Sequence, residues 1–326
     1  MSVTQAINIG RTERRETLKS VGLPVVAIVF LIILFSVLSP TFLQPSTFLT
    51  ILRESSVLLV VAVGMTLVII QGSIDLSVGA TVTLAGLVAA SVTKETDSVF
   101  LAILAALAVG LVVGLVNGVI FAYGKVPSFL VTLGMSMAVG GVGTWLVSGR
   151  PVQVSDQGLR WVAQGQLLVI VPNLVLWAVI VWLIFTFIGM KTRFGRYVFA
   201  IGGAEAVSAL AGIPNRRVKL WALTIAGFCA AIAGILLTSR IGSATPGMGD
   251  ALTLNSIAAV VMGGTAITGG VGGVQRTVLG VLVITTLTVG LNSLGVMPYM
   301  QLIIQGLVVV AAVALTLDRS KLTVIK

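Results

Sequence analysis

The sequence contains no histidine, a single cysteine and few charged residues, which make up 9% of its 326 positions. The absence of histidine excludes a histidine metal site and a Ser–His–Asp triad. Cys229 has no partner for an internal disulfide, and its apolar surroundings indicate a small packing residue. There is no phosphate-binding G-x-x-x-x-G-K-[ST] motif, since the only Gly-Lys pair is Gly124-Lys125. The chain is therefore not expected to be an enzyme or to hold a metal or cofactor.

The hydrophobic content of 57% is that of an integral membrane protein. A soluble domain has about a quarter of its residues charged, and no hydrophilic stretch here is long enough for a separate soluble domain. We expect an all-α fold of about ten transmembrane helices, each an apolar run of roughly 17–25 residues. The runs cover residues 22–39, 55–72, 74–92, 99–123, 126–147, 167–189, 218–239, 253–268, 277–294 and 298–316.

The basic residues orient these runs. If the N-terminus lies in the cytoplasm and the spans alternate, the basic residues left outside are only Arg53, Lys94, Arg150, Arg160 and Arg240, out of 20. This positive-inside bias places both termini in the cytoplasm and explains the net charge of +10 without nucleic acid. It predicts a cytoplasmic arm at 1–21, a polytopic membrane domain at 22–316 and a cytoplasmic tail at 317–326. The basic arm precedes a full-length apolar run without a cleavage site, so we expect a retained first helix.

The inner segment 190–219 is longer than a connector needs to be. Its pattern predicts a turn at Gly202-Gly203, then a short helix with small residues on one face, ended by Gly212 and Pro214. Such a helix suits docking into a groove on another protein, with lipid phosphates as further partners of the flanking arginines. The alternative is an amphipathic helix that rests on lipid, although its alanines argue against that.

Asp75 lies between two apolar runs, where a carboxylate is costly to bury. Three roles compete: a cap that accepts from the N–H of Ser77 or Val78, a residue that lines a translocation path, and a proton or cation relay. The glycine-rich stretch 265–273 imitates this segment, with Asp75 aligned on Thr268. Repeat-built transporters place broken helices near the substrate pathway.

The candidate path or helix-break residues share polar or small side chains within or between spans. They are Asp75, Ser77, Gly79, Asn117, Thr268, Gly269, Gly270 and Asn292. For Asn117 and Asn292 the competing interpretation is an interhelical hydrogen bond. Gly110, Gly114 and Gly118, spaced by four, indicate close helix packing rather than a pore.

Four blocks resemble the membrane permease of sugar ABC importers of the ribose, xylose, arabinose and galactose type. They are "GMTLVIIQGSIDLSVGATVTLAG", "NGVIFAYGKVPSFLVTLGM", "TRFGRYVFAIGGAEAVSALAGI" and "GGTAITGGVGGVQRTVLG", in order over about residues 50–316. The resemblance implies a type II importer-like permease fold in a bacterial inner membrane. It also implies a second permease subunit, a periplasmic or extracellular solute-binding protein, and separate ATPase subunits that bind the ATP and magnesium.

The family's coupling loop, in the style "GGNEEAARLSGI", matches Gly202, Gly203, Glu205, Ala206, Ala209, Leu210, Gly212 and Ile213. The resemblance implies that these residues form the ATPase-coupling helix. Ala204 stands where the family has asparagine, so a side-chain cap for this helix is missing.

Other functions remain as alternatives. An ABC permease for a nucleoside, a signalling furanose or a branched-chain amino acid would share the broad fold. An ion-coupled secondary transporter needs buried ionisable groups, and Asp75 is the one acidic candidate near a span interior.

Overall fold

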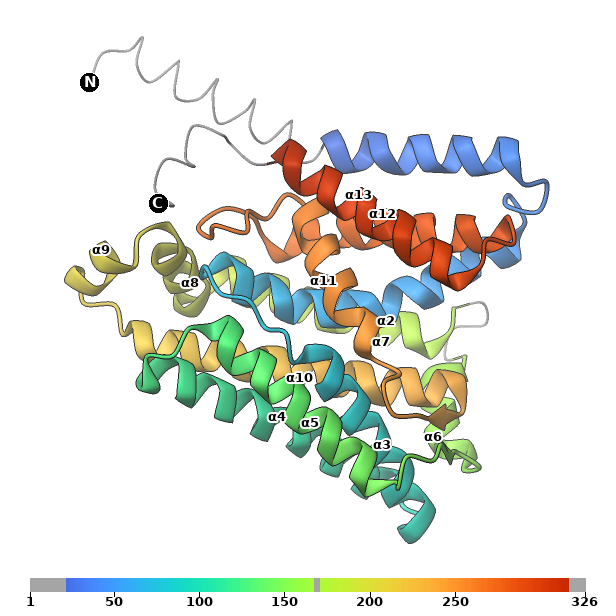
Figure 1. Ribbon diagram of the computed structural model, residues 1–326, viewed down its shortest axis with the longest axis horizontal. Coiled ribbons are helices and arrows are strands. Elements are labelled where there is room, and N and C mark those ends of the chain that lie inside the picture. Colours follow the sequence, from blue (N-terminus) through green and yellow to red (C-terminus); the bar gives the residue numbers. More distant parts are fainter. Residues whose placement is uncertain (1–21, 167–170, 317–326) are drawn as a thin grey trace.

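The computed structural model describes residues 22–166 and 171–316. The predicted arm at 1–21, the tail at 317–326 and the start of the predicted sixth span lie outside the described residues. Within them the chain is almost entirely helical, which confirms the all-α prediction (Figure 1). The helices are Gly22–Leu38, α2 Pro45–Ile70, α3 Val78–Thr96, α4 Val99–Gly124, α5 Ser128–Leu146, α6 Gln157–Gln164, α7 Asn173–Lys191, α8 Arg193–Gly203, α9 Glu205–Leu210, α10 Asn215–Ile241, α11 Asp250–Met262, α12 Val274–Ser293 and α13 Pro298–Thr316.

Each predicted apolar run coincides with a helix, although the boundaries differ. Six described helices are long and apolar enough to cross a membrane: α2, α4, α5, α7, α10 and α12. The helices Gly22–Leu38 and Asp250–Met262 are shorter apolar helices, and α3 carries Lys94 and Glu95 in its last turn. The structure therefore supports a multi-pass membrane protein, while the number of ten spans stays a prediction.

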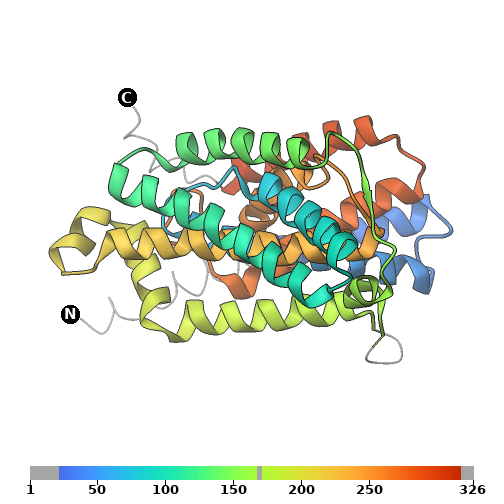
Figure 2. The same ribbon diagram turned by 90° about the horizontal axis from the view of Figure 1, so that it is seen from below.

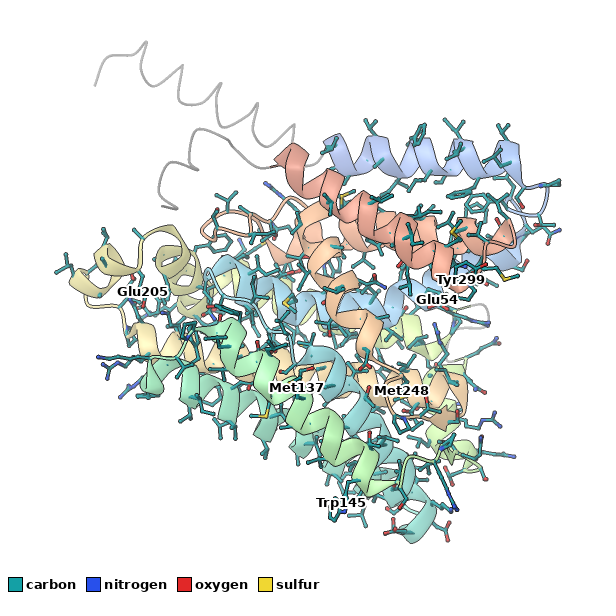
Figure 3. The ribbon with its side chains drawn as sticks, viewed as in Figure 1. Glu54, Met137, Trp145, Glu205, Met248 and Tyr299 are labelled. Carbon is teal, nitrogen blue, oxygen red and sulfur yellow. The ribbon has the colours of Figure 1, made fainter. Side chains whose placement is uncertain are left out.

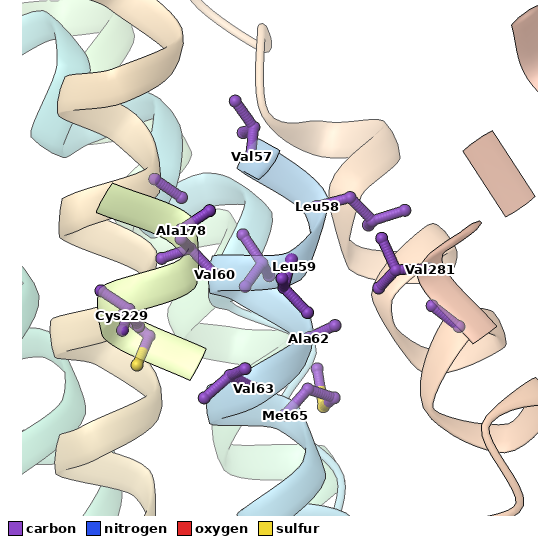
Figure 4. Packing of buried hydrophobic residues seen from close by; sticks show 14 of the residues in the cluster. Val57, Leu58, Leu59, Val60, Ala62, Val63, Met65, Ala178, Cys229 and Val281 are labelled. Carbon is purple, nitrogen blue, oxygen red and sulfur yellow. The ribbon is translucent and has the colours of Figure 1, made fainter. Parts of the chain in front are cut away.

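Helix α2 forms the centre of the bundle. In its most apolar window 89% of the residues are buried, against 28% for α4 and 22% for α5. Figure 4 shows its side chains, from Val57 to Met65, contacting Ala178 of α7, Cys229 of α10 and Val281 of α12. A helix that is apolar on all sides is expected either in such a core or in lipid, and here the surrounding helices provide the core. Cys229 is fully buried there, as its apolar surroundings predict.

Glycines allow α4 and α10 to approach backbone to backbone. A Cβ on Gly110 would stand 2.3 Å from the Gly227 carbonyl oxygen, and one on Gly114 would stand 2.6 Å from that of Leu223. Gly118 is equally close to Leu220. The prediction that these glycines mark close helix packing is confirmed, because any larger residue would force the two helices apart.

The outer helices present apolar side chains to the surroundings. Trp145 of α5 projects from the edge of the bundle in Figure 3, and Trp145 and Met137 of the same helix are 79% and 76% exposed. Tyr299 of α13 is 65% exposed on another side. In a multi-pass membrane protein, such surfaces are covered by lipid or by another subunit.

Two features of the chain differ from the sequence prediction. Gly202-Gly203 was predicted as a turn, and this is wrong: both glycines end α8, and only Ala204 separates α8 from α9. Helix α6 was not predicted, nor was the pairing of the two-residue strands β1 (Val152–Gln153) and β2 (Ser243–Ala244). These short elements lie at the end of α7 opposite to α8 and α9 (Figures 1 and 2).

Candidate functional site: two helix breaks and an elbow

The first break, residues 71–77, separates α2 from α3 and contains Asp75. The Asp75 carboxylate is 1% exposed, and its Oδ1 accepts from the Ser77 N–H at 2.8 Å and from the Ser77 hydroxyl at 2.6 Å. The first of these is the hydrogen bond that the cap interpretation predicts. Asn117 Nδ2 of α4 donates to Ser77 Oγ at 2.8 Å, so Asn117 links α4 to the first break. The two bonds from Ser77 to Oδ1 offset part of the cost of burying this carboxylate.

Helix α5 supports the same break from the other side. The N–H of Ile74 donates to Ser128 Oγ at 3.2 Å, and that of Leu76 donates to Thr132 Oγ1 at 3.0 Å. These two hydroxyls, one turn apart, take the place of the helical carbonyls that the broken backbone lacks. Irregular backbone at membrane depth is tolerated only with such protein partners. The first break is therefore held mainly by side chains.

The second break, residues 263–273, joins α11 to α12 and is built on glycines. Gly264, Gly269, Gly270 and Gly272 all have positive φ, a conformation that other residues adopt only with strain. The N–H of Gly270 donates to the carbonyl oxygen of Ile70, the last residue of α2, at 2.8 Å. This bond links the second break directly to the start of the first.

The elbow, residues 193–213, consists of α8, Ala204, α9 and the residues that end it. Helix α9 has no side-chain cap at Ala204, as the departure from the family pattern predicts. It ends in a Schellman motif, because Gly212 has φ +77° and its N–H donates to the Ala209 carbonyl, while Ile213 N–H donates to that of Ser208. The predicted left-handed cap at Gly212 is confirmed.

Polar contacts hold α9 on the first turns of α10. Glu205 pairs with Lys219, and its carbonyl oxygen accepts from Ser208 Oγ and from Asn215 Nδ2. The opposite side of α9 is open, with Val207 64% and Leu210 90% exposed. Figures 1 and 2 show α9 at one extremity of the molecule, and Figure 3 marks Glu205 there.

Comparison with known proteins identifies the family. The family model described as "Branched-chain amino acid transport system / permease component" matches residues 47–313. The chain belongs to this permease family. It is 42% identical over 304 residues to the ribose import permease protein RbsC of Bacillus subtilis, an alignment that covers 91% of this chain and 92% of that protein. It is 40% identical over 292 residues to RbsC of Escherichia coli K12, an alignment that covers 88% of this chain and 91% of that protein. It is 36% identical over 321 residues to the galactose/methyl galactoside import permease protein MglC of the same organism, which covers 91% of this chain and 94% of MglC.

The permease gathers some of the predicted path residues and separates others. Asp75, Ser77, Gly79 and Asn117 surround the first break, where the Gly79 N–H also donates to Thr253 Oγ1 of α11 at 3.0 Å. Thr268, Gly269 and Gly270 lie in the second break. Asn292 lies apart from both, near the end of α12, where its Oδ1 accepts from Gln301 Nε2 of α13 at 2.7 Å.

The sequence analysis missed Ser128 and Thr132 as partners of the first break. Their signal was present, since two hydroxyl residues one turn apart begin an apolar helix of the permease. It also missed Gln71, which is 3% exposed and whose amide has no hydrogen-bond partner in the described residues.

Proposed function

We propose that this permease is the membrane subunit of a binding-protein-dependent ABC importer for a monosaccharide. Its similarity to ribose and galactose import permeases over about nine-tenths of the chain supports this substrate class. Two copies, or this chain and a related subunit, would enclose the translocation path, and a solute-binding protein would deliver the sugar from outside.

The structural observation that carries this function is the exposed apolar side of α9. Leu210 is the most exposed of the large apolar residues in the described chain, yet it stands on a tip next to Arg216 and Arg217 rather than on a lipid-facing side of the bundle. An apolar residue on a polar tip suits a contact with a soluble protein. We assign that contact to the ATPase. The elbow, both termini and most basic residues would then lie in the cytoplasm of a bacterium. The membrane domain would lie in its inner membrane.

The path would pass the two helix breaks. In this arrangement the Asp75 carboxylate shapes the first break through the two hydrogen bonds that its Oδ1 accepts from Ser77. The ATPase chain supplies the ATP and the magnesium.

Leu210→Asp tests the docking surface. We would purify the permease with its candidate ATPase and binding protein, place the complex in lipid vesicles, and measure ATP hydrolysis and uptake of labelled ribose and galactose. Removing a central apolar contact from an interface weakens binding by about 2 kcal/mol, so the variant is expected to lose most of the ATPase on purification. Trp161→Ser on α6, at the other end of α7, is the control, since Trp161 is 53% exposed but far from α9.

Other outcomes separate the alternatives. If the native complex hydrolyses ATP in response to a binding protein loaded with a nucleoside or an amino acid, the substrate class is wrong and the importer stands. If the native chain recruits no ATPase and moves solute under an ion gradient, the importer proposal is wrong. If Leu210→Asp retains the ATPase as Trp161→Ser does, α9 is not the docking surface.

A further inference from the structure

The C-terminal end of α8 meets both helix breaks at one point. A Cβ on Gly202 would stand 1.7 Å from the carbonyl oxygen of Ile70 and 2.5 Å from the backbone nitrogen of Gly270. No side chain fits there, so three backbones are in direct contact: the elbow, the end of α2 and the second break.

The glycines of the second break complete this contact. A Cβ on Gly269 would lie 2.9 Å from the backbone nitrogen of Gly72 and 3.0 Å from the Gly202 carbonyl oxygen, and one on Gly270 would lie 2.8 Å from the Cα of Gly203. The hydrogen bond from the Gly270 N–H to the Ile70 carbonyl oxygen joins the second break to the end of α2 at the same point. We name Ile70, Gly72, Gly202, Gly269 and Gly270 the glycine junction; Gly203 borders it with its backbone, and its Cβ position faces open space.

Elsewhere α8 contacts α2 through side chains, since Val198 and Ile201 lie in one buried cluster with Ile70. An open pocket of about 360 Å³ lies beside this cluster, lined by residues of α2, α7, α8 and the start of α12. The direct backbone contact between α8 and the breaks is at the end next to α9. Direct backbone contacts without intervening side chains cannot be relaxed by a change of rotamer, so a displacement of one partner moves the other two.

We propose that Gly202 is a positioning residue for transport, which transmits a displacement of the elbow to both helix breaks at once. This rests on the proposed function in so far as the ATPase moves the elbow. The glycine junction makes the two breaks respond together, because the elbow, the end of α2 and the second break share one contact. Gly202 acts through the breaks and does not itself contact sugar or nucleotide.

Neighbouring glycines provide matched variants. Gly202 and Gly203 are consecutive helical residues, and alanine is the better helix former. A Cβ on Gly203 meets nothing within 4 Å, so Gly203→Ala raises the helix propensity without crowding Ile70 or Gly270. A Cβ on Gly195 would stand 2.0 Å from the Gly189 carbonyl oxygen, so Gly195→Ala crowds the same helix against α7, away from the breaks.

The first measurement is the amount of sugar imported per ATP hydrolysed by the reconstituted complex, together with its thermal stability. Gly202→Ala is expected to lower this ratio about tenfold. Gly203→Ala should leave the ratio unchanged and the stability no lower than native, and Gly195→Ala should lower the stability while the ratio stays within about twofold. If Gly202→Ala keeps the native ratio, or Gly195→Ala lowers it equally, the proposal is overturned.

The second measurement needs no ATPase and stays valid if the proposed function fails. Because the one cysteine, Cys229, is fully buried, spin labels can be placed on cysteines introduced at exposed Ala206 and Val271, on the elbow and the second break. In the permease alone in lipid, a narrow distance distribution is expected for the native junction and for Gly203→Ala, and a broader or shifted one for Gly202→Ala. An unchanged distribution in Gly202→Ala would overturn the junction whether or not the chain imports sugar.

Discussion

The two helix breaks interrupt the bundle by different physical means. The first break is held by side chains: Asp75 binds Ser77, and the hydroxyls of Ser128 and Thr132 receive backbone N–H groups. The second break is held by backbone geometry, with four glycines at positive φ and close contacts to other main chains. A break held by side chains can exchange its partners one at a time. A break held by backbone contacts moves only as a unit, so the first break can adjust locally while the second cannot.

The largest expected effect is the loss of the Asp75 carboxylate. In Asp75→Ala the buried N–H and hydroxyl of Ser77 lose their acceptor, so the free energy of unfolding should fall by about 3 kcal/mol. Reversible unfolding in mixed detergent measures this. Asp75→Asn keeps an acceptor oxygen and should lose less than half as much. Equal stability of Asp75→Ala and the native chain would show that the first break does not depend on this side chain.

A smaller loss is expected from Gly269→Ala in the second break. The left-handed conformation with a Cβ costs about 1–2 kcal/mol, and the contacts with Gly72 and Gly202 add to it, for a total of about 2 kcal/mol or more. Gly212→Ala is the control, since Gly212 also has positive φ but open space around it. The same unfolding assay applies. If both variants lose equal stability, conformation alone holds the second break and the backbone contacts contribute nothing.

The smallest effect concerns the support from α5. Thr132→Val leaves the Leu76 N–H without its acceptor and should lower the free energy of unfolding by about 1 kcal/mol. Thr144→Val on the same helix is the control, because Thr144 is exposed and its hydroxyl donates only to its own helix, at the Gly140 carbonyl. Equal losses in the two variants would assign the effect to helix propensity rather than to the break.

Local patterns in the sequence predict local structure well in this chain. The spacing of Gly110, Gly114 and Gly118 predicts a close helix contact, and Gly212 with Pro214 predicts the end of α9, because each depends on a few neighbouring residues. The position of Asp75 between two apolar runs likewise predicts the first break. For the glycines of α4 the pattern predicts that a close contact exists, but not that its partner is α10.

The contacts that join distant segments could not be predicted in the same way. Gly202-Gly203 reads as a turn from the sequence, since glycine is a poor helix former. In the structure both residues are helical, and Gly202 is needed for its closeness to Ile70 and Gly270. The polar residues of the predicted path also separate, with Asn292 bound to Gln301 instead of the breaks. A glycine or a polar residue in the sequence shows that its position is restricted, but not which distant segment restricts it.

The glycine contact between α4 and α10 also bears on how the chain is inserted during synthesis. Helix α4 is made long before α10, so the surface with Gly110 and Gly114 has no protein partner when it leaves the ribosome. Its mean hydropathy of 3.0 is the highest of the six long described helices, as expected of a segment that is stable in lipid before its protein partner is made. Helix α10 can pack on it only after residues 215–241 are synthesised. The high hydropathy of α4 thus suits the order in which the two helices are synthesised.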